Sequence, residues 1–330
     1  MNMMTPVSGN GGNVYLNSYL APFDAWLAAD DVTEILVNRP QEVWVERMGA
    51  NEMERHDAPE IDAQLLERLA QQVARISHQG INRESPLLAA ILPGGARIQI
   101  VLPPATRGSV AIAIRKHVLH DMTVDGYLEQ CSTGPRNDAK SELSLSALLD
   151  KGDISTFLKK AVAMRKTILL SGGTSSGKTT LLNALLKEIP HNERVIAIED
   201  TPEIKLGRNN AIGLVAVSGD QGEARVTIEE LMRASLRMRP DRLIVGELRG
   251  AETVTFLRAI NTGHPGSIST IHASTTQGAF EQLALMCMQA DLGLCRAETI
   301  DYAKSMIDII VQLDRKNGHR SIADIQFKGD

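Results

Sequence analysis

The first 118 residues mix short alternating runs with one helical pattern. The runs 34–38 and 43–45 have the β-branched character of a strand pair, with the turn residues 39–41 between them. Two further strand-like runs are 97–102 and 109–114. Between the two pairs, apolar residues recur at steps of three and four, at Ile61, Leu65, Leu66, Leu69, Val73 and Ile76. This spacing is typical of an amphipathic helix that packs on a core, so we predict an α+β domain over residues 14–118.

Beyond residue 150 the pattern changes, because short apolar runs now alternate with stretches of helical character. The strand-like runs are 166–171, 195–199, 243–247 and 266–271, and the helical stretches are 181–187, 227–237 and 253–260. Such alternation is typical of a parallel sheet covered by helices, which predicts a C-terminal α/β domain over residues 151–330. The polar stretch 119–150 is predicted to be an interdomain linker, and the polar, glycine-rich residues 1–13 a flexible N-terminus.

One segment, between a predicted strand and a predicted helix, carries the most specific chemistry. It consists of Gly172, Gly173, Thr174, Ser175, Ser176, Gly177, Lys178, Thr179 and Thr180. This run fits the P-loop pattern G-x-x-x-x-G-K-[ST]. Glycines let backbone N–H groups surround phosphate oxygens, and the helix N-terminus adds partial positive charge. Lys178 is expected to contact the β- and γ-phosphates and Thr179 to ligate Mg²⁺, so the sequence predicts ATP and Mg²⁺ as cofactors.

Polar residues also end three of the other predicted strands. Glu199, Asp200 and Glu203 follow one strand, Glu247 ends the next, and His272 ends a third. Ligands bind beyond the carboxyl ends of parallel strands, which makes these groups candidates for orienting water and holding the metal shell. For His272 a purely structural role stays open, with His264 as a competitor. Four clustered arginines could form a solvated helix face, a subunit contact or an arginine finger: Arg233, Arg237, Arg239 and Arg242.

Composition narrows the function classes further. Apolar residues make up 43% of the 330 residues, and 35 basic against 40 acidic residues give a net charge of −5. This balance, with 3% aromatic residues, argues against a protein that wraps nucleic acid, and no direct sequence-specific nucleic-acid binding is expected. The first residues lack a signal-peptide pattern and no run of 18 apolar residues occurs. We therefore expect a cytoplasmic protein with at most peripheral membrane contact.

Four segments together resemble the conserved boxes of secretion traffic ATPases, in order and spacing. They are 172–180 (Walker A), 198–204 (Asp box), 237–249 (Walker B) and 262–273 (His box). With the N-terminal segments 94–103 and 112–116, the chain resembles the VirB-type hexameric ATPases of bacterial type IV secretion and conjugation systems. The resemblance implies a RecA-like P-loop ATPase domain with a smaller N-terminal α+β domain.

The resemblance also implies roles for individual residues. Glu203 matches the Asp-box acid, Glu247 the Walker B glutamate, and His272 the residue that senses the γ-phosphate. Arg97 and Arg115 match N-terminal arginines that reach the nucleotide phosphates. The implied function is an ATP-hydrolysing motor that forms a homo-hexamer at the cytoplasmic face of the inner membrane. Its implied partners are inner-membrane components and other ATPases of the secretion machine.

Two departures affect this interpretation. Gly246 stands where many P-loop enzymes have an aspartate, which weakens the assignment of a second direct protein ligand for Mg²⁺. The cysteine-pair zinc module of type II secretion and pilus-assembly ATPases is absent, since Cys131, Cys287 and Cys295 are scattered. The alternatives are a pilus or type II secretion motor, a RecA-like nucleic-acid translocase, or a nucleotide-gated scaffold.

Overall fold

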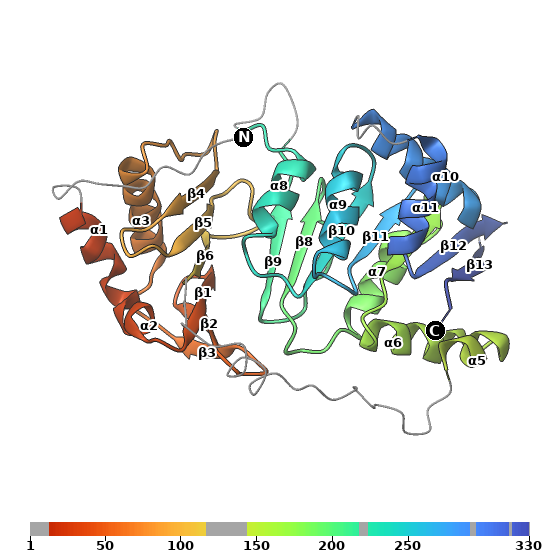
Figure 1. Cartoon of the computed structure of the whole chain (residues 1–330), viewed down its shortest axis with the longest axis horizontal. Helices are drawn as coiled ribbons and strands as arrows, with labels where there is room; N and C mark the ends of the chain where they lie inside the picture. The colour runs from red at the N-terminus through yellow and green to blue at the C-terminus, as the bar shows by residue number, and fades with distance from the viewer. Residues whose placement is uncertain (1–12, 117–143, 218–223, 291–294, 317–318, 330) are drawn as a thin grey trace, which may run out of the picture.

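The computed structural model contains two β-sheets that lie side by side, each with its own helices (Figure 1). It describes residues 13–116, 144–217, 224–290, 295–316 and 319–329. Most of the predicted linker lies outside these ranges, as do Cys131 and the first twelve residues. The helix α5 (Leu145–Asp150) falls within the range predicted as linker, yet it packs in the C-terminal core. The division into domains at the predicted boundaries stays a prediction.

The N-terminal sheet is antiparallel throughout, with the strand order β3-β2-β1-β6-β5-β4. Its strands are β1 (Val32–Arg39), β2 (Glu42–Arg47), β3 (Glu54–Asp57), β4 (Leu87–Ile91), β5 (Arg97–Val101) and β6 (Ala111–Arg115). Its helices are α1 (Asn13–Leu20), the 3₁₀ turn η1 (Ala21–Phe23), α2 (Asp24–Ala28) and α3 (Ala63–Ile76). The predicted strand pair, the predicted helix and the two later strands are confirmed. Asp62 caps α3, because its carboxylate accepts the N–H of Leu65 at 2.7 Å.

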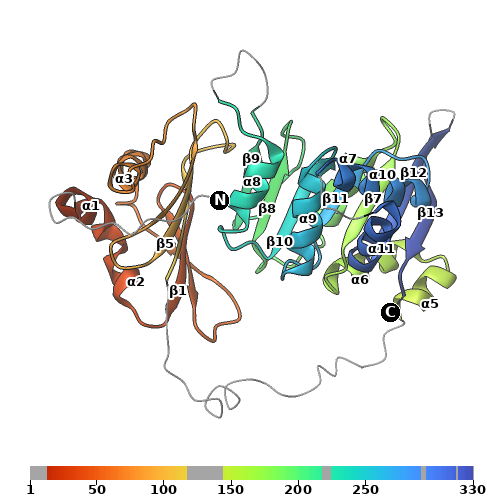
Figure 2. The same ribbon diagram turned by 45° about the horizontal axis from the view of Figure 1, so that its top comes forward.

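The two faces of this sheet have different neighbours. Ile35, Ile112 and Ile114 pack with α3 in one core cluster, whereas Leu36, Ala111 and Ala113 belong to a cluster shared with the C-terminal half. Successive side chains of a strand point to opposite faces, so alternate residues of one buried run pack in different core clusters. Ala111 and Ala113 add little side-chain volume where this second face packs against the C-terminal half. Figure 2 shows the two sheets next to each other.

The C-terminal sheet has the order β13-β12-β7-β11-β10-β8-β9 and is parallel except for the β12–β13 hairpin. Its strands are β7 (Ile168–Gly172), β8 (Val195–Glu199), β9 (Ala211–Val215), β10 (Arg242–Leu248), β11 (Ile268–Ile271), β12 (Ile309–Lys316) and β13 (His319–Phe327). Besides α5, its helices are α6 (Ile154–Ala163), α7 (Lys178–Leu186), α8 (Ile228–Ser235), α9 (Glu252–Asn261), α10 (Thr276–Gln289) and α11 (Arg296–Met306). The predicted parallel strands and helices are confirmed, while β9 and the hairpin had no counterpart in the sequence analysis.

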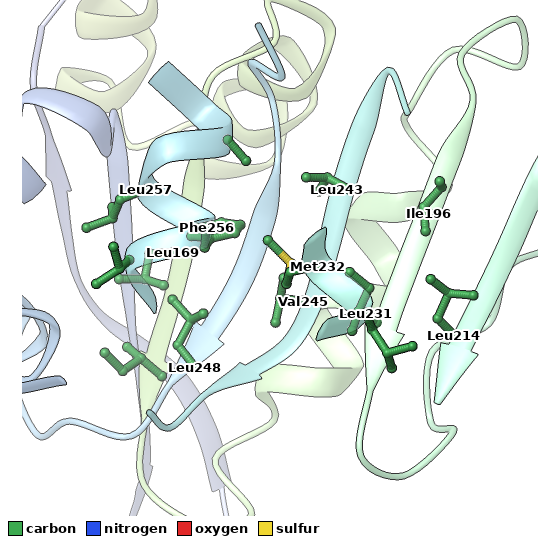
Figure 3. Packing of buried hydrophobic residues seen from close by; sticks show 14 of the residues in the cluster. Leu169, Ile196, Leu214, Leu231, Met232, Leu243, Val245, Leu248, Phe256 and Leu257 are labelled. Carbon is green, nitrogen blue, oxygen red and sulfur yellow. The ribbon is translucent and has the colours of Figure 1, made fainter. Parts of the chain in front are cut away.

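Helices cover both faces of this sheet. The helices α8, α9, α10 and α11 pack on one face, where Met232 and Phe256 meet strand residues such as Val245 (Figure 3). The helices α5, α6 and α7 pack on the other face, around Phe157 and Leu182. Burial on both faces explains why these strands appear in the sequence as continuous apolar runs. None of the helices in the described ranges is long and apolar enough to span a bilayer.

Candidate active site

The glycine-rich loop joins β7 to α7 as the sequence predicts. Gly177 precedes the first helical residue with φ of 102°, in the left-handed region that favours glycine. At Gly172, an added Cβ would lie 2.7 Å from the carbonyl oxygen of Leu313 on β12. Both positions therefore require glycine for backbone reasons. The loop places the N-terminus of α7 at the carboxyl edge of the sheet, where an anion is stabilised by free N–H groups.

Lys178 is held inside this loop. Its Nζ donates to the carbonyl oxygens of Gly172 at 2.8 Å and Gly173 at 3.1 Å, and it lies 3.4 Å from Nε2 of His272. Burial lowers the pKa of the Lys178 ammonium, while the charge of Glu247 acts in the opposite direction and that of Arg249 in the same direction. A phosphate oxygen at this position would replace the two carbonyl oxygens as the partner of the ammonium.

A pocket with about 490 Å³ of empty volume lies next to the loop. Its lining consists of Thr179, Glu199, Asp200, Thr201, Glu203, Ile204, Gly246, Glu247, Arg249 and Thr270. These residues come from the first turn of α7 and from the ends of β8, β10 and β11. The pocket thus brings together three residues predicted from the sequence, namely Thr179, Glu203 and Glu247. Within the described ranges no group of three or more His, Cys, Asp or Glu side chains could hold a metal ion, so a divalent cation at Thr179 would need phosphate oxygens among its ligands.

Glu247 is the centre of a charged cluster at this pocket. Its Oε1 lies 2.7 Å from Nε2 of His272, and its other oxygen pairs with Arg249. Arg249 also pairs with Asp200, through an Nη1–Oδ2 distance of 2.5 Å. Since Lys178 also approaches His272, the predicted histidine joins the glycine loop to the predicted acid. The competitor His264 lies elsewhere, with Nδ1 3.1 Å from the carbonyl oxygen of Ala259 at the end of α9.

Glu199 is the most buried carboxylate of the pocket, with 2% of its surface exposed. Its Oε1 accepts the backbone N–H groups of Glu203 at 3.0 Å and Ile204 at 2.7 Å. A Cβ added at Gly246 would lie 3.1 Å from Cγ of Glu199. The glycine that replaces the usual aspartate on β10 therefore leaves room for a carboxylate from the neighbouring strand β8.

The structure does not bring Arg97 and Arg115 to this pocket. They face each other across the β5–β6 pair and line a second pocket with Leu236 and Arg237. Nε of Arg115 lies 2.8 Å from Oε1 of the buried Glu34. Contact of these two arginines with nucleotide phosphates stays a prediction.

The four clustered arginines, one in α8 and three after it, have different partners. Arg242 is fully buried and pairs with Glu193, and Arg239 pairs with Asp241 and with Glu46 on β2. Those two arginines are structural. Arg233 pairs with Glu229 on the exposed face of α8, and Arg237 lines the second pocket.

Two arginines were missed in the sequence analysis: Arg249, which lines the first pocket, and Arg107, which pairs with a lining residue. Arg249 directly follows the Walker B strand, so its position beside an acid could have indicated it. Arg107 follows β5 in the N-terminal half and pairs with Glu199. No local pattern marks Arg107, because its partner is 92 positions away in the chain.

Known proteins are similar to this chain over most of its length. The family described as "Type II/IV secretion system protein" matches residues 20–321. The type IV secretion system protein VirB11 of Bartonella quintana is 39% identical over 327 residues, which cover 93% of this chain and 91% of that protein. The type IV secretion system protein PtlH of Bordetella pertussis is 39% identical over 326 residues, with 94% of each chain covered.

A solved structure is also similar over nearly the whole chain. It is the VirB11 ATPase of the Brucella suis type IV secretion system in complex with sulphate, with a TM-score of 0.87 and 36% identity. The match covers 96% of this chain and 95% of that chain. The predicted fold class, a RecA-like P-loop domain with a smaller N-terminal α+β domain, is confirmed, and so is a nucleotide as ligand. The chain belongs to the type II/IV secretion system protein family.

Proposed function

We propose that this chain is the ATP-hydrolysing motor of a bacterial type IV secretion or conjugation system. One observation carries the proposal: the glycine loop, Glu247 and His272 meet at the carboxyl edge of one parallel sheet. The similarity to the VirB11 proteins and to PtlH supports type IV secretion as the process. ATPase activity follows from the family and from the similarity to the Brucella suis ATPase.

The positions of the site residues suggest a division of roles. Lys178 and the N–H groups of α7 bind the β- and γ-phosphates, because they supply positive charge inside the loop. Glu247 orients the attacking water, and its present partners Arg249 and His272 hold it at the pocket. His272 lies between Lys178 and Glu247, so it can sense whether a γ-phosphate is present.

Mg²⁺ would bind at this pocket together with the phosphate oxygens of the nucleotide. Thr179 would hold it directly, and Glu203 would contact it through water. When bound, Mg²⁺ neutralises charge on the phosphate oxygens. Glu199 is tied to two backbone N–H groups, so its role is to shape the pocket wall rather than to bind the cation.

The proposal extends to assembly and location. A homo-hexamer is expected from the family resemblance, with the inner-membrane components and other ATPases of the machine as partners. The ring would contact the inner membrane peripherally from the cytoplasmic side. Arg97 and Arg115 would reach nucleotide phosphates when the N-terminal sheet moves relative to the C-terminal sheet or in contact with a neighbouring subunit.

The test combines ATP hydrolysis, ATP binding and particle mass for the wild type, Lys178→Ala and Glu247→Gln. We expect turnover by a six-subunit particle, and loss of at least about 100-fold in both variants. Glu247→Gln should keep its affinity for ATP, because it leaves the phosphate-binding loop intact, whereas Lys178→Ala should lose affinity.

His264→Ala is the matched control, since that histidine lies outside the pocket, and it should hydrolyse ATP at the wild-type rate. A wild-type protein with no turnover in any oligomeric state, or a Glu247→Gln variant as active as wild type, would contradict the motor function.

A further inference from the structure

A loop of the N-terminal half joins the edge of the C-terminal sheet. Residues 103–108 follow β5 and run along β9, where Thr106 forms an antiparallel bridge with Leu214. The N–H of Arg107 donates to the carbonyl oxygen of Gly213 at 3.1 Å, and the N–H of Val215 donates to that of Ala105 at 3.0 Å. These backbone hydrogen bonds set the position of Arg107 relative to the C-terminal sheet.

The side chain of Arg107 crosses this sheet edge toward the first pocket. A Cβ added at Gly213 would lie 2.4 Å from Cδ of Arg107, so the glycine leaves the path open. Beyond it, the guanidinium pairs with Glu199 and donates from Nη1 to the carbonyl oxygen of Ile204 at 2.6 Å. Its side chain is 24% exposed, against 2% for Glu199.

Glu199 links this arginine to the wall of the nucleotide pocket. One carboxylate oxygen holds the N–H groups of Glu203 and Ile204, and the other faces Arg107. Glu199 therefore holds the backbone N–H groups at the end of the segment 199–204, and Arg107 holds the carbonyl group of Ile204. A buried carboxylate without a cationic partner is strongly disfavoured, so removal of Arg107 should loosen this segment.

We propose that Arg107 is a positioning residue. Through it, the position of the N-terminal half determines the position of the segment 199–204, which forms the Asp-box wall of the nucleotide pocket. Arg107 acts through Glu199 and does not touch the nucleotide. The effect on turnover rests on the proposed ATPase function, whereas the effect on the segment 199–204 does not. A shift of the loop at β9 would change the wall that carries Glu203, which couples domain movement to the pocket.

The first test measures amide hydrogen exchange at Glu203 and Ile204 in the full-length, nucleotide-free protein. Arg107→Gln should speed exchange of both amides by about tenfold or more, because their acceptor loses its cationic partner. Arg107→Lys should restore part of the protection, since it keeps the charge but loses the planar fork that reaches two partners. Gly213→Ala leaves Arg107 in the chain but blocks its path, so it should resemble Arg107→Gln.

Arg47→Gln is the matched control. Arg47 is a 30% exposed arginine of the N-terminal half that pairs with Asp31 at 2.9 Å and Glu54 at 3.1 Å, and it does not line the first pocket. It should leave the exchange of Glu203 and Ile204 unchanged. Equal protection in wild type, Arg107→Gln and Gly213→Ala would overturn the proposal.

The second test separates kcat from KM for ATP. Arg107→Gln should lower kcat about tenfold or more and change KM less than about threefold, because the phosphate-binding loop stays intact. In a double-mutant cycle, Arg107→Gln should lower kcat much less when Glu199 is already replaced by Gln than it does in the wild type. Additive effects, or a change in KM alone, would contradict a role through Glu199. If the wild type itself shows no turnover, the proposed function fails while the exchange test still decides the role of Arg107.

Discussion

At the scale of single residues, Gly246 and Glu199 form a close contact between the neighbouring strands β10 and β8. The Walker B strand lacks the usual aspartate, yet the stem of Glu199 fills the space beside Gly246. A Cβ at position 246 would lie 3.1 Å from Cγ of Glu199, so a side chain there would require the buried Glu199 to shift. The departure seen in the sequence therefore coincides with a close approach of β8, whose Glu199 shapes the pocket wall and does not replace the aspartate as a cation ligand.

Glu34 gives a prediction at the same scale. Burial raises its pKa from 4.5 to about 7, and Arg115 opposes the rise only partly. Between about pH 4.5 and 7, Glu34 therefore binds a proton in the folded protein but not in the unfolded chain. Proton binding by Glu34 stabilises the folded protein at low pH, and this contribution to the free energy of unfolding is lost as pH rises through 7. When the pH rises from 5 to 8, the difference in free energy of unfolding between Glu34→Gln and wild type should shift by about 2 to 3 kcal/mol in favour of the variant.

Urea denaturation at both pH values measures this difference. Glu54→Gln is the control, because Glu54 lies at the surface and pairs with Arg47. It should not show the same gain at high pH. A difference between Glu34→Gln and wild type that stays constant from pH 5 to 8 would show that Glu34 titrates normally.

At the scale of secondary structure elements, caps decide where α8 begins. Oγ1 of Thr227 accepts the N–H of Glu230 at 3.1 Å, and Oε2 of Glu230 accepts the N–H of Thr227 at 2.8 Å. This reciprocal pair forms a capping box. Thr227→Ala should lower the free energy of unfolding by about 1 kcal/mol, because the first turn loses an acceptor. Urea denaturation checks the value.

The control for this prediction is Glu229→Ala in the same turn. Its side chain pairs with Arg233 on the exposed face and caps nothing, so a loss of about 0.5 kcal/mol or less is expected. If Thr227→Ala costs no more than Glu229→Ala, the cap does not determine the start of α8.

At the scale of the whole molecule, a buried arginine joins the two halves. Nη1 of Arg194 donates to Oδ1 of Asn38 on β1 and to Oδ1 of Asn210, each at 2.6 Å. Its Nε donates to the carbonyl oxygen of Met238 at 2.9 Å. Arg194→Met should cost about 2 to 4 kcal/mol, because buried acceptors on both sides lose their donor.

Asn38→Ala is the graded comparison, since it removes one of these acceptors and keeps the arginine paired. It should cost about 1 to 2 kcal/mol, and Arg194→Met should also separate the unfolding of the two halves in denaturant titrations. Equal costs, or a single unchanged transition in Arg194→Met, would argue that apolar packing alone joins the halves.

The sequence by itself determined the parts of this protein whose chemistry is local. The glycine loop, the strand-ending acids Glu203 and Glu247, and the periodicity of α3 could all be predicted, because each depends on neighbours in the chain. His272 was a strand-end candidate as well, the family resemblance gave it a sensing role, and the structure places it beside Lys178 and Glu247. The arginine roles implied by the same resemblance remain predictions, since Arg97 and Arg115 lie at another pocket.

Only the tertiary structure decided which distant side chains meet. The pairing of Arg107 with Glu199 and the burial of Arg194 among residues of both halves depend on how β9 and β1 approach each other, and no local pattern encodes that approach. The strand β9 and the β12–β13 hairpin were missed for a different reason. The edge strand β9 has five residues and contains Gly213, and the edge strand β13 is mostly exposed and polar, so both have a weak local strand pattern. Local propensity sets the elements, whereas packing between the two sheets sets the wall of the nucleotide pocket.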